Sequence, residues 1–200
     1  MTRTELVTLL SGHVAAHQDA AQPAAAAAPT GVMLVRLQRL REFRLQHGYA
    51  AGDTLASAAH RLIQGVVRPQ DVVSRIGDVE FVVVLPDLHD RHHAALAGNR
   101  IVRAFQEPLV IGTRPVLAAV AVGISVAPDH GREPEMLLRN AELALGTAMR
   151  SSDHSVLYTA TDESQQVPYE ALRDAIAANQ LEVHLQPILD LRSNTIVGAE

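Results

Sequence analysis

The sequence predicts an α+β fold, in which helices pack on a mixed sheet that contains antiparallel strands. Short β-branched runs and amphipathic helical segments follow one another in the order β-α-α-β-β-α-β-α-β. Two of these strands are joined by a Gly-centred turn, which is a hairpin signal and requires antiparallel neighbours. The arrangement is therefore expected to be ferredoxin-like or palm-type rather than doubly wound.

The composition limits what kind of protein this is. The 200 residues are 48% hydrophobic but only 3% aromatic, so the core must consist of Ala, Val, Leu and Ile. The formal charge of −5 is too mild to attract nucleic acid or an anionic membrane. The absence of cysteine excludes disulfides, thiolate metal sites and Cys nucleophiles. With no apolar run of about 20 residues and no signal-peptide pattern, we expect a cytoplasmic protein that binds neither nucleic acid nor membrane.

The first half of the chain predicts helices, a strand and the hairpin. Residues 4–18 carry apolar side chains near helical spacing, whereas the Ala- and Pro-rich stretch 21–31 is expected to be a loop. A short buried strand is expected at 32–37. Residues 52–67 place Leu, Ile and Ala on one helical face, and the hairpin occupies 71–85.

The second half predicts two helices and two strands, followed by a change of composition. Helices are expected at 91–105 and 133–150, and strands at 116–126 and 155–159. A strand–turn–strand unit that stops at the last residue is not a complete domain. We therefore expect four parts: an N-terminal helix and Ala/Pro-rich loop (1–30) belonging to the first domain, that domain's main body (31–160), a polar linker (161–168) and the beginning of an incomplete second domain (169–200).

The hairpin carries a short acidic motif, R-I-G-D-V-E-F followed by V-V-V-L-P, with Gly77, Asp78, Val79, Glu80 and Phe81 at its centre. It resembles the R-x-G-G-D-E-F-x-x-x-L-P signature of diguanylate cyclases, the GGDEF family. Three further blocks resemble that family in the same order: G-Y-A-A-G-D at 48–53, A-V-G-I-S-V-A-P-D-H-G at 121–131 and L-L-R-N-A-E-L-A-L at 137–145. Residues 31–160 as a whole thus resemble a GGDEF domain.

The resemblance places several catalytic positions on unsuitable residues. Joining two GTP molecules requires Mg²⁺ or a similar cation held by carboxylates. The family's metal-binding aspartates fall on Arg36 and Val79, and its second signature Gly falls on Asp78. The carboxylates that remain as possible metal ligands are Glu80 and, if it is shifted into the site, Asp78. We therefore expect a degenerate signature with no catalytic residue, no metal and no cofactor in this chain.

The substrate positions implied by the resemblance are changed as well. The guanine-binding Asn and Asp of the family fall on Arg44 and Leu45, and a phosphate-binding Lys falls on Met149, although Arg41 is able to stand in for a phosphate ligand. Arg36 and Arg39 join Arg41 and Arg44 in a basic run at the start of a predicted helix. A solvated face is the favoured interpretation of this run, with an anion or an acidic partner as the alternative.

One ligand-binding feature of the family is retained in the sequence. R-P-Q-D, with Arg68 and Asp71, lies five residues before Gly77, at the spacing of the family's inhibitory cyclic-di-GMP site, and Arg100 is the matching third residue. An Arg fork binds phosphate or a guanine edge, and an Asp accepts from guanine N–H groups. Two interpretations stay open, a cyclic-di-GMP site and an ordinary solvated turn.

Histidines and an aspartate gather at residues 89–93, H-D-R-H-H. Such a cluster is able to bind a transition metal. Polar residues are also expected immediately before a helix, and this second interpretation is favoured.

Residues 169–200 resemble the opening of the EAL family of cyclic-di-GMP phosphodiesterases. Gln186 lies at that family's ligand position and Glu200 at the glutamate that names its motif, while its Tyr is replaced by Leu185. An EAL barrel needs about 250 residues with metal ligands from several strands. We expect this chain to contain only a helix and a β-strand fragment of the barrel, and to need Mg²⁺ or Mn²⁺ only when the domain is complete.

These observations predict a catalytically inactive GGDEF module that controls an attached EAL domain in cyclic-di-GMP signalling. Control is expected through cyclic di-GMP itself, through a homodimer or through a partner signalling protein. Two alternatives remain. One is an active cyclase that uses Asp78 and Glu80 as shifted metal ligands, and the other is a purely structural dimerisation domain.

Overall fold

A computed structural model describes residues 3–18, 28–160, 169–180, 182 and 184–199. The chain divides into two compact units, a first unit of Met1–Glu163 and a second unit of Ser164–Glu200. The predicted linker, most of the Ala- and Pro-rich loop and Glu200 lie outside the described residues.

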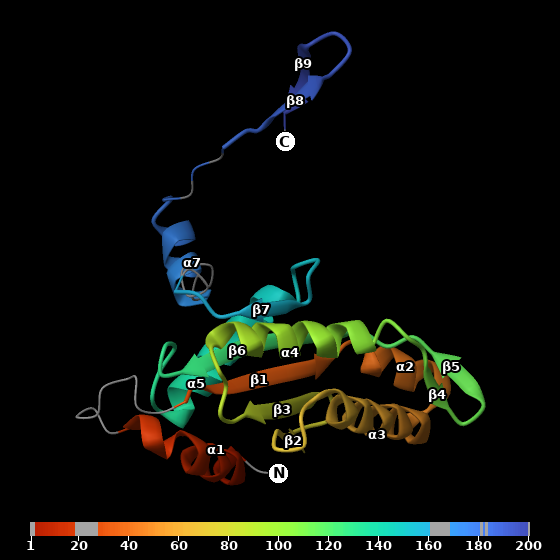
Figure 1. Ribbon diagram of the computed structural model, residues 1–200. Helices are drawn as coiled ribbons and strands as arrows, with labels where there is room; N and C mark the ends of the chain where they lie inside the picture. Colours follow the sequence, from red (N-terminus) through yellow and green to blue (C-terminus); the bar gives the residue numbers. More distant parts are fainter. Residues whose placement is uncertain (1–2, 19–27, 161–168, 181, 183, 200) are drawn as a thin grey trace. The chain divides into compact units, whose positions relative to one another are not determined.

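The first unit is built around a five-stranded sheet with the strand order β2-β3-β1-β6-β7. The strands β2, β3, β1 and β6 pair with one another in antiparallel fashion in this order, and β7 joins β6 in parallel. This is the predicted α+β fold with a mixed sheet (Figure 1). The strands are β1 (Thr30–Leu37), β2 (Val72–Arg75), β3 (Glu80–Leu85), β6 (Val120–Ala127) and β7 (Ser155–Leu157).

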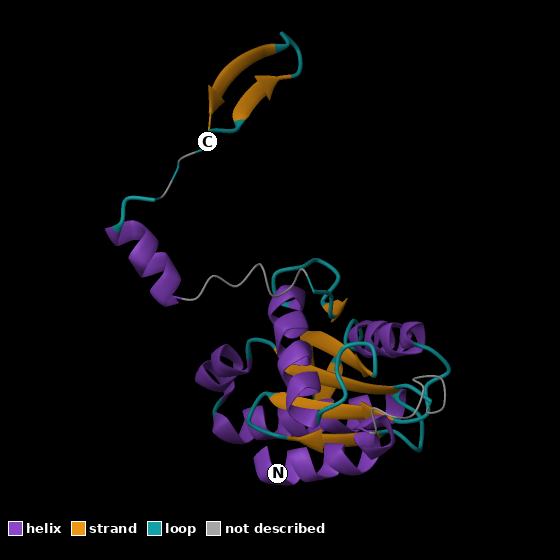
Figure 2. Cartoon of the chain, turned by 90° about the vertical axis from the view of Figure 1, so that its left-hand side faces the viewer, coloured by secondary structure: helices purple, strands orange, loops and turns teal. Residues whose placement is uncertain are grey.

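Helices cover both faces of this sheet (Figure 2). One buried cluster joins the strands to α3 (Tyr49–Val66) and α4 (Arg91–Ala104), and a second joins the opposite face to α1 (Arg3–Gln18) and α5 (Pro134–Ala148). Along each central strand, alternate side chains enter alternate clusters because successive residues point to opposite faces. This two-sided burial explains why the strands are apolar at nearly every position.

A close backbone contact fixes α5 on the sheet. A Cβ atom at Gly123 of β6 would lie 2.1 Å from the carbonyl oxygen of Ala141 and 2.2 Å from the nitrogen of Leu145. Only a glycine allows the helix to approach this closely. The approach brings the C-terminal half of α5 over the end of β1.

Helix α4 begins at a side-chain cap. Asp90 accepts hydrogen bonds from the backbone N–H groups of His92 and His93, at 2.7 and 3.1 Å. A carboxylate at this position satisfies two of the free amides of the first turn and suits the positive end of the helix dipole. The favoured interpretation of the run at 89–93, a polar helix start, therefore has a specific structural basis.

Two details of the sequence prediction were wrong. The run at 116–126 was expected to be one strand, but a separate hairpin of β4 (Leu109–Ile111) and β5 (Arg114–Val116) comes first, and β6 begins at Val120. Gly112, with φ of 64°, makes the turn of this hairpin. The whole basic run from Arg36 was placed at the start of a helix, but Arg36 lies in β1, within the strand expected at 32–37, and the short helix α2 spans Leu40–His47.

The second unit contains a helix, α7 (Tyr169–Ala177), and a hairpin of β8 (Pro187–Asp190) and β9 (Thr195–Ala199). The hairpin turn is held by the Asp190 carboxylate, which accepts from the Arg192 backbone N–H and the Ser193 hydroxyl. Its large apolar side chains, such as Ile196 and Val197, are exposed. An isolated hairpin of this kind is only marginally stable.

No helix in the described part of the chain has the length and apolar character needed to span a bilayer.

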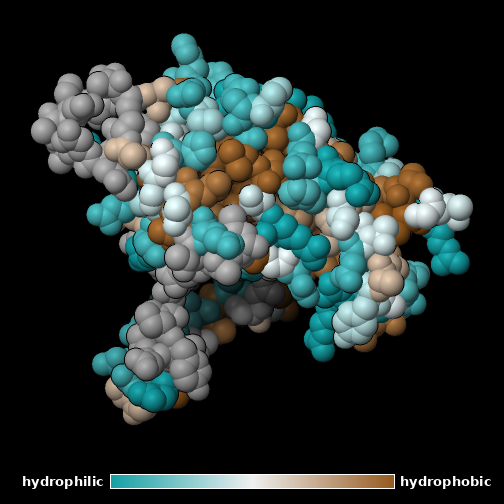
Figure 3. All heavy atoms as spheres, turned by 90° about the horizontal axis from the view of Figure 1, so that it is seen from below, coloured by the Kyte–Doolittle hydropathy of each residue, from teal (hydrophilic) through white to brown (hydrophobic). Residues whose placement is uncertain are grey.

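Figure 3 shows the first unit from the side that α1, β2 and α3 occupy in Figure 1, and there apolar side chains gather in the middle of a largely hydrophilic face.

Candidate functional site

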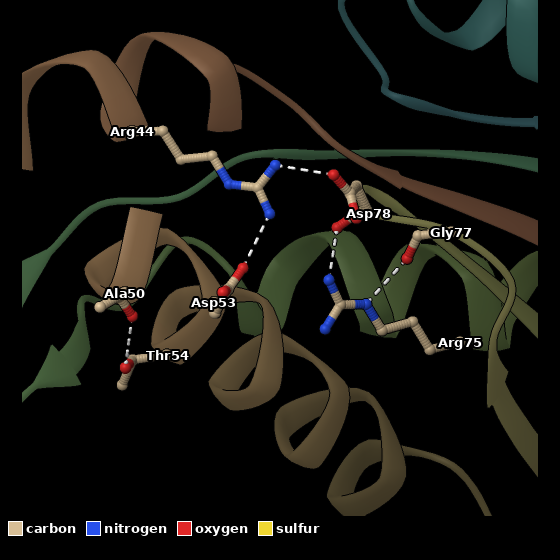
Figure 4. Close-up of polar contacts among 7 residues, drawn as sticks. All are labelled: Arg44, Ala50, Asp53, Thr54, Arg75, Gly77 and Asp78. Atoms are coloured by element: carbon tan, nitrogen blue, oxygen red, sulfur yellow. Dashed lines mark hydrogen bonds and ion pairs between the residues drawn. The ribbon is translucent and has the colours of Figure 1, made fainter. Parts of the chain in front are cut away.

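The predicted hairpin between β2 and β3 forms, and its tip is held by Arg75. The Arg75 guanidinium donates to the carbonyl oxygens of Gly77 at 2.8 Å and Asp78 at 3.0 Å (Figure 4). The tip projects Asp78 and Glu80 towards two different arginines. The candidate site therefore has two parts, one around each arginine.

The first part is centred on Arg36. In the sheet, Arg36 of β1 lies directly opposite Glu80 of β3. Its Nε donates to Glu80 Oε1 at 2.8 Å, and its Nη2 contacts the same oxygen. Nη2 also lies 3.0 Å from Glu142 Oε1, and Nη1 lies 3.2 Å from the sulfur of Met149. Arg36 thus joins β1, β3 and α5.

The electrostatics of this cluster favour the charged guanidinium. Burial lowers the pKa of Arg36, but the hydrogen bond to Glu80 and the attraction of Glu80 and Glu142 outweigh burial, so the pKa is raised above its usual value. Both glutamates are partly exposed. Among the described residues, no group of three or more His, Cys, Asp or Glu side chains is arranged to hold a metal ion.

The second part is centred on Arg44 of α2. Its Nη1 donates to Asp78 Oδ2 and its Nη2 to Asp53 Oδ1, each at 2.8 Å (Figure 4). The hydrogen bond and charge of Arg44 hold the pKa of Asp78 below its usual value. The stem of Arg44 lies against Gly52, where a Cβ atom would come within 2.4 Å of the Arg44 Cγ.

Arg44 therefore occupies the space between the hairpin tip and the N-terminal end of α3. The family resemblance implies that Arg44 replaces a guanine-binding Asn. A cation paired with two carboxylates therefore lies where the resemblance implies a guanine-binding side chain. Leu45, which follows it, is 76% exposed. Arg41 is also exposed on α2.

A third group of residues lies at the junction of α3 and β2, away from the hairpin tip. Arg68, Asp71 and Arg100 line one pocket of about 290 Å³, whose remaining walls are mostly apolar. Arg68 Nη2 donates to Asp71 Oδ1 at 2.8 Å and to the Pro86 carbonyl at 2.9 Å, and the Arg68 backbone N–H donates to Asp71 Oδ2 at 2.7 Å. The structure thus brings together all three residues of the predicted cyclic-di-GMP site.

The Asp71 carboxylate is already engaged in this pocket. Its side chain is 2% exposed, whereas that of Arg68 is 38% exposed. The arginines, rather than the aspartate, are therefore the groups that an incoming anion reaches.

Sequence reasoning missed three partners of these sites. Glu142 lies within the L-L-R-N-A-E-L-A-L block and Asp53 ends the G-Y-A-A-G-D block, but neither was given a role. His93 also lines the pocket with Arg68 and Arg100. In the second unit, Gln186 precedes β8 and is exposed.

The geometry agrees with the comparisons to known proteins. The family model for diguanylate cyclase, GGDEF domain, matches residues 8–154. The chain belongs to the GGDEF family, whose signalling molecule is cyclic di-GMP.

Relatives in this family carry different names. The cyclic di-GMP phosphodiesterase NbdA of Pseudomonas aeruginosa is 33% identical over 172 residues, which cover 82% of this chain and 22% of NbdA. The diguanylate cyclase TpbB of the same species is 30% identical over 122 residues, or 60% of this chain and 28% of TpbB. The chain therefore spans less than a third of the length of either relative.

Among solved structures, the GGDEF-only delta-N mutant of TpbB (also called YfiN) from Pseudomonas aeruginosa matches with a TM-score of 0.74 and 26% identity. The match covers 82% of this chain and 93% of that one. It supports the fold of the first unit.

Proposed function

We propose that the first unit is a catalytically inactive GGDEF domain that serves as a regulatory module in a cyclic-di-GMP signalling protein. The observation that carries this proposal is the position of Arg36. Its guanidinium lies between Glu80 and Glu142, where the family resemblance requires a metal-binding carboxylate.

A divalent cation does not fit this donor set. Each glutamate already contacts the guanidinium, and Mg²⁺ needs near-octahedral oxygen ligands. At an effective dielectric constant of about 20, two like unit charges 4 Å apart repel by about 4 kcal/mol, and a second charge on the metal doubles this. The rival proposal of shifted ligands is also disfavoured, because Asp78 is paired with Arg44 and Glu80 with Arg36.

Turnover of GTP is the direct test. The protein is incubated with GTP and either Mg²⁺ or Mn²⁺, and the products are separated by chromatography. We expect no cyclic di-GMP. Formation of cyclic di-GMP that disappears in the Glu80→Gln variant would establish the rival enzyme instead.

We propose further that residues 169–200 begin an EAL phosphodiesterase domain, with Gln186 and Glu200 at its ligand and metal positions. The exposed apolar side chains of the β8–β9 hairpin support this, because they need a larger sheet to cover them. A longer protein with the complete domain should hydrolyse cyclic di-GMP with Mg²⁺ or Mn²⁺, whereas the present chain should not. Production of linear dinucleotide by these 200 residues would contradict the proposal.

The first unit is also proposed to bind cyclic di-GMP in the pocket of Arg68, Asp71 and Arg100. The pocket combines two guanidinium groups with largely apolar walls, which supports this proposal. Guanidinium groups bind the phosphates of a dinucleotide, and apolar walls accommodate its flat bases. Calorimetric titration should detect binding that is lost in Arg68→Ala and weakened in Arg100→Ala. Unchanged affinity in both variants would leave Arg68 and Asp71 as turn residues.

A further inference from the structure

The pocket of Arg68 and Arg100 also contains a histidine side chain. His93 lies in the first turn of α4 and lines the pocket together with both arginines. Arg100 follows it by two helical turns, so the two side chains share one face of α4. The His93 side chain is 50% exposed and is therefore accessible to a ligand.

The orientation of the His93 ring is set by Asp90. The ring nitrogen Nδ1 lies 3.0 Å from Asp90 Oδ1. A carboxylate only accepts hydrogen bonds, so Nδ1 carries the proton of this contact. The hydrogen bond from His93 is the main cause of a pKa for Asp90 below its usual value. The other ring nitrogen, Nε2, lies on the opposite side of the ring from this contact.

We propose that His93 is a further ligand-contacting residue of this pocket and donates from Nε2 to a phosphate of the dinucleotide. This inference rests on the proposed binding of cyclic di-GMP by the first unit. Donation from both ring nitrogens requires the imidazolium form. Binding therefore takes up one proton, and affinity rises as the pH falls.

The surrounding charges allow this protonation. Arg68 and Arg100 oppose a further positive charge, whereas Asp90, Asp71 and the ligand phosphates favour it. Asp71 is already neutralised by Arg68, so Asp90 and the phosphates are the decisive anions. The charged and titratable groups around His93 are Asp90 and His89 before the helix, Arg100 on α4, and Arg68 and Asp71 across the pocket.

Calorimetry with cyclic di-GMP near pH 6 and near pH 8 tests the inference. Because the proposed contact needs the imidazolium form, its charge-assisted hydrogen bond should make binding about five- to tenfold tighter at the lower pH. The variant His93→Gln should bind at both pH values with the weaker affinity. The matched control is His92→Gln, an exposed neighbour outside the pocket, which should keep the pH dependence of the unmodified protein.

A second readout does not depend on any variant. Titrations in buffers of different ionisation enthalpy should show uptake of up to one proton near pH 7 on binding. Equal affinity at both pH values with no proton uptake would overturn the role of His93 while leaving the site intact. The same holds if His93→Gln keeps the pH dependence. Absence of any binding at either pH would instead overturn both the site and this inference.

Discussion

Arg36 and Glu80 lie opposite each other on adjacent antiparallel strands, and the guanidinium contacts one carboxylate oxygen through both Nε and Nη2. Glu142 contacts the same guanidinium, so both glutamates of the site are partners of a fixed cation. The stability of the hairpin tip should then depend on an arginine rather than on a bound metal.

The first prediction concerns that pair. Arg36→Ala leaves Glu80 and Glu142 facing each other without a cation, and it should lower the free energy of unfolding by about 1–2 kcal/mol. The control Arg41→Ala, on the exposed face of α2, should change it by less than about 0.5 kcal/mol. Urea denaturation measures both. Equal effects of the two variants would show that the Arg36 contacts do not stabilise the fold.

The second prediction concerns the buried carboxylate of Asp71. Asp71→Ala removes the acceptor of the Arg68 backbone N–H and side chain, and it should cost about 2–3 kcal/mol of stability. The exposed neighbour Gln70 provides the control, because Gln70→Ala should be nearly neutral. If both variants melted at the same temperature, Asp71 would have no structural role.

The third prediction concerns the close contact between β6 and α5. Gly123→Ala places a methyl group on the backbone of Ala141 and Leu145, which has no room to move, and it should cost more than about 3 kcal/mol. Gly65→Ala tests the opposite case, because a Cβ there meets nothing within 4 Å. That helical position should gain up to about 1 kcal/mol. Thermal unfolding separates the two, and a tolerated Gly123→Ala would mean that α5 is not fixed on β6.

The fourth prediction concerns the pH dependence of stability. Burial, with a smaller effect of Arg91, lowers the pKa of His130 from its usual 6.5 despite the opposing charge of Asp129. His130 Nδ1 accepts from the Val126 backbone N–H at 3.0 Å, which only the neutral ring can do. Between the folded and unfolded pKa values the unfolded chain binds more protons. Stability should therefore be constant above about pH 6.5 and fall below it.

Urea denaturation between about pH 5.5 and 8 measures this effect. The decline in the free energy of unfolding should not exceed about 1.4 kcal/mol per pH unit for one histidine. The variant His130→Gln should lack the part of this decline that His130 causes. His60, whose pKa is lowered by burial and then by Arg75 and Arg61, adds a second contribution of the same sign. A curve for His130→Gln that matches the unmodified protein would assign the whole effect to other groups.

The fold was largely predictable because each buried helix carries a helical period of apolar residues and each buried strand is a short, nearly continuous apolar run. The strands at 32–37 and 155–159 and the helices at 91–105 and 133–150 agree with the structure within a few residues. The β4–β5 hairpin was not predictable in this way. It is three residues long on each side and merges with the apolar run that follows.

The candidate site was predictable only in part. The family resemblance identified the positions of Arg36, Arg44 and Glu80, but not which side chains they contact. Glu142 lies 106 residues from Arg36 in sequence and reaches it only because Gly123 lets α5 approach β6. Likewise, burial of the Asp71 carboxylate depends on tertiary packing, and no spacing rule signals it.

Binding of Mn²⁺ distinguishes an arginine-filled site at the hairpin from a metal site. Electron paramagnetic resonance of Mn²⁺ titrated into the protein should show no ion bound at the hairpin tip, because Arg36 already supplies the positive charge there. Arg36→Asp, with folding checked by circular dichroism, should gain a site that Glu80→Gln then removes. A tightly bound Mn²⁺ in the unmodified protein that is lost in Glu80→Gln would show instead that the site holds a metal beside Arg36.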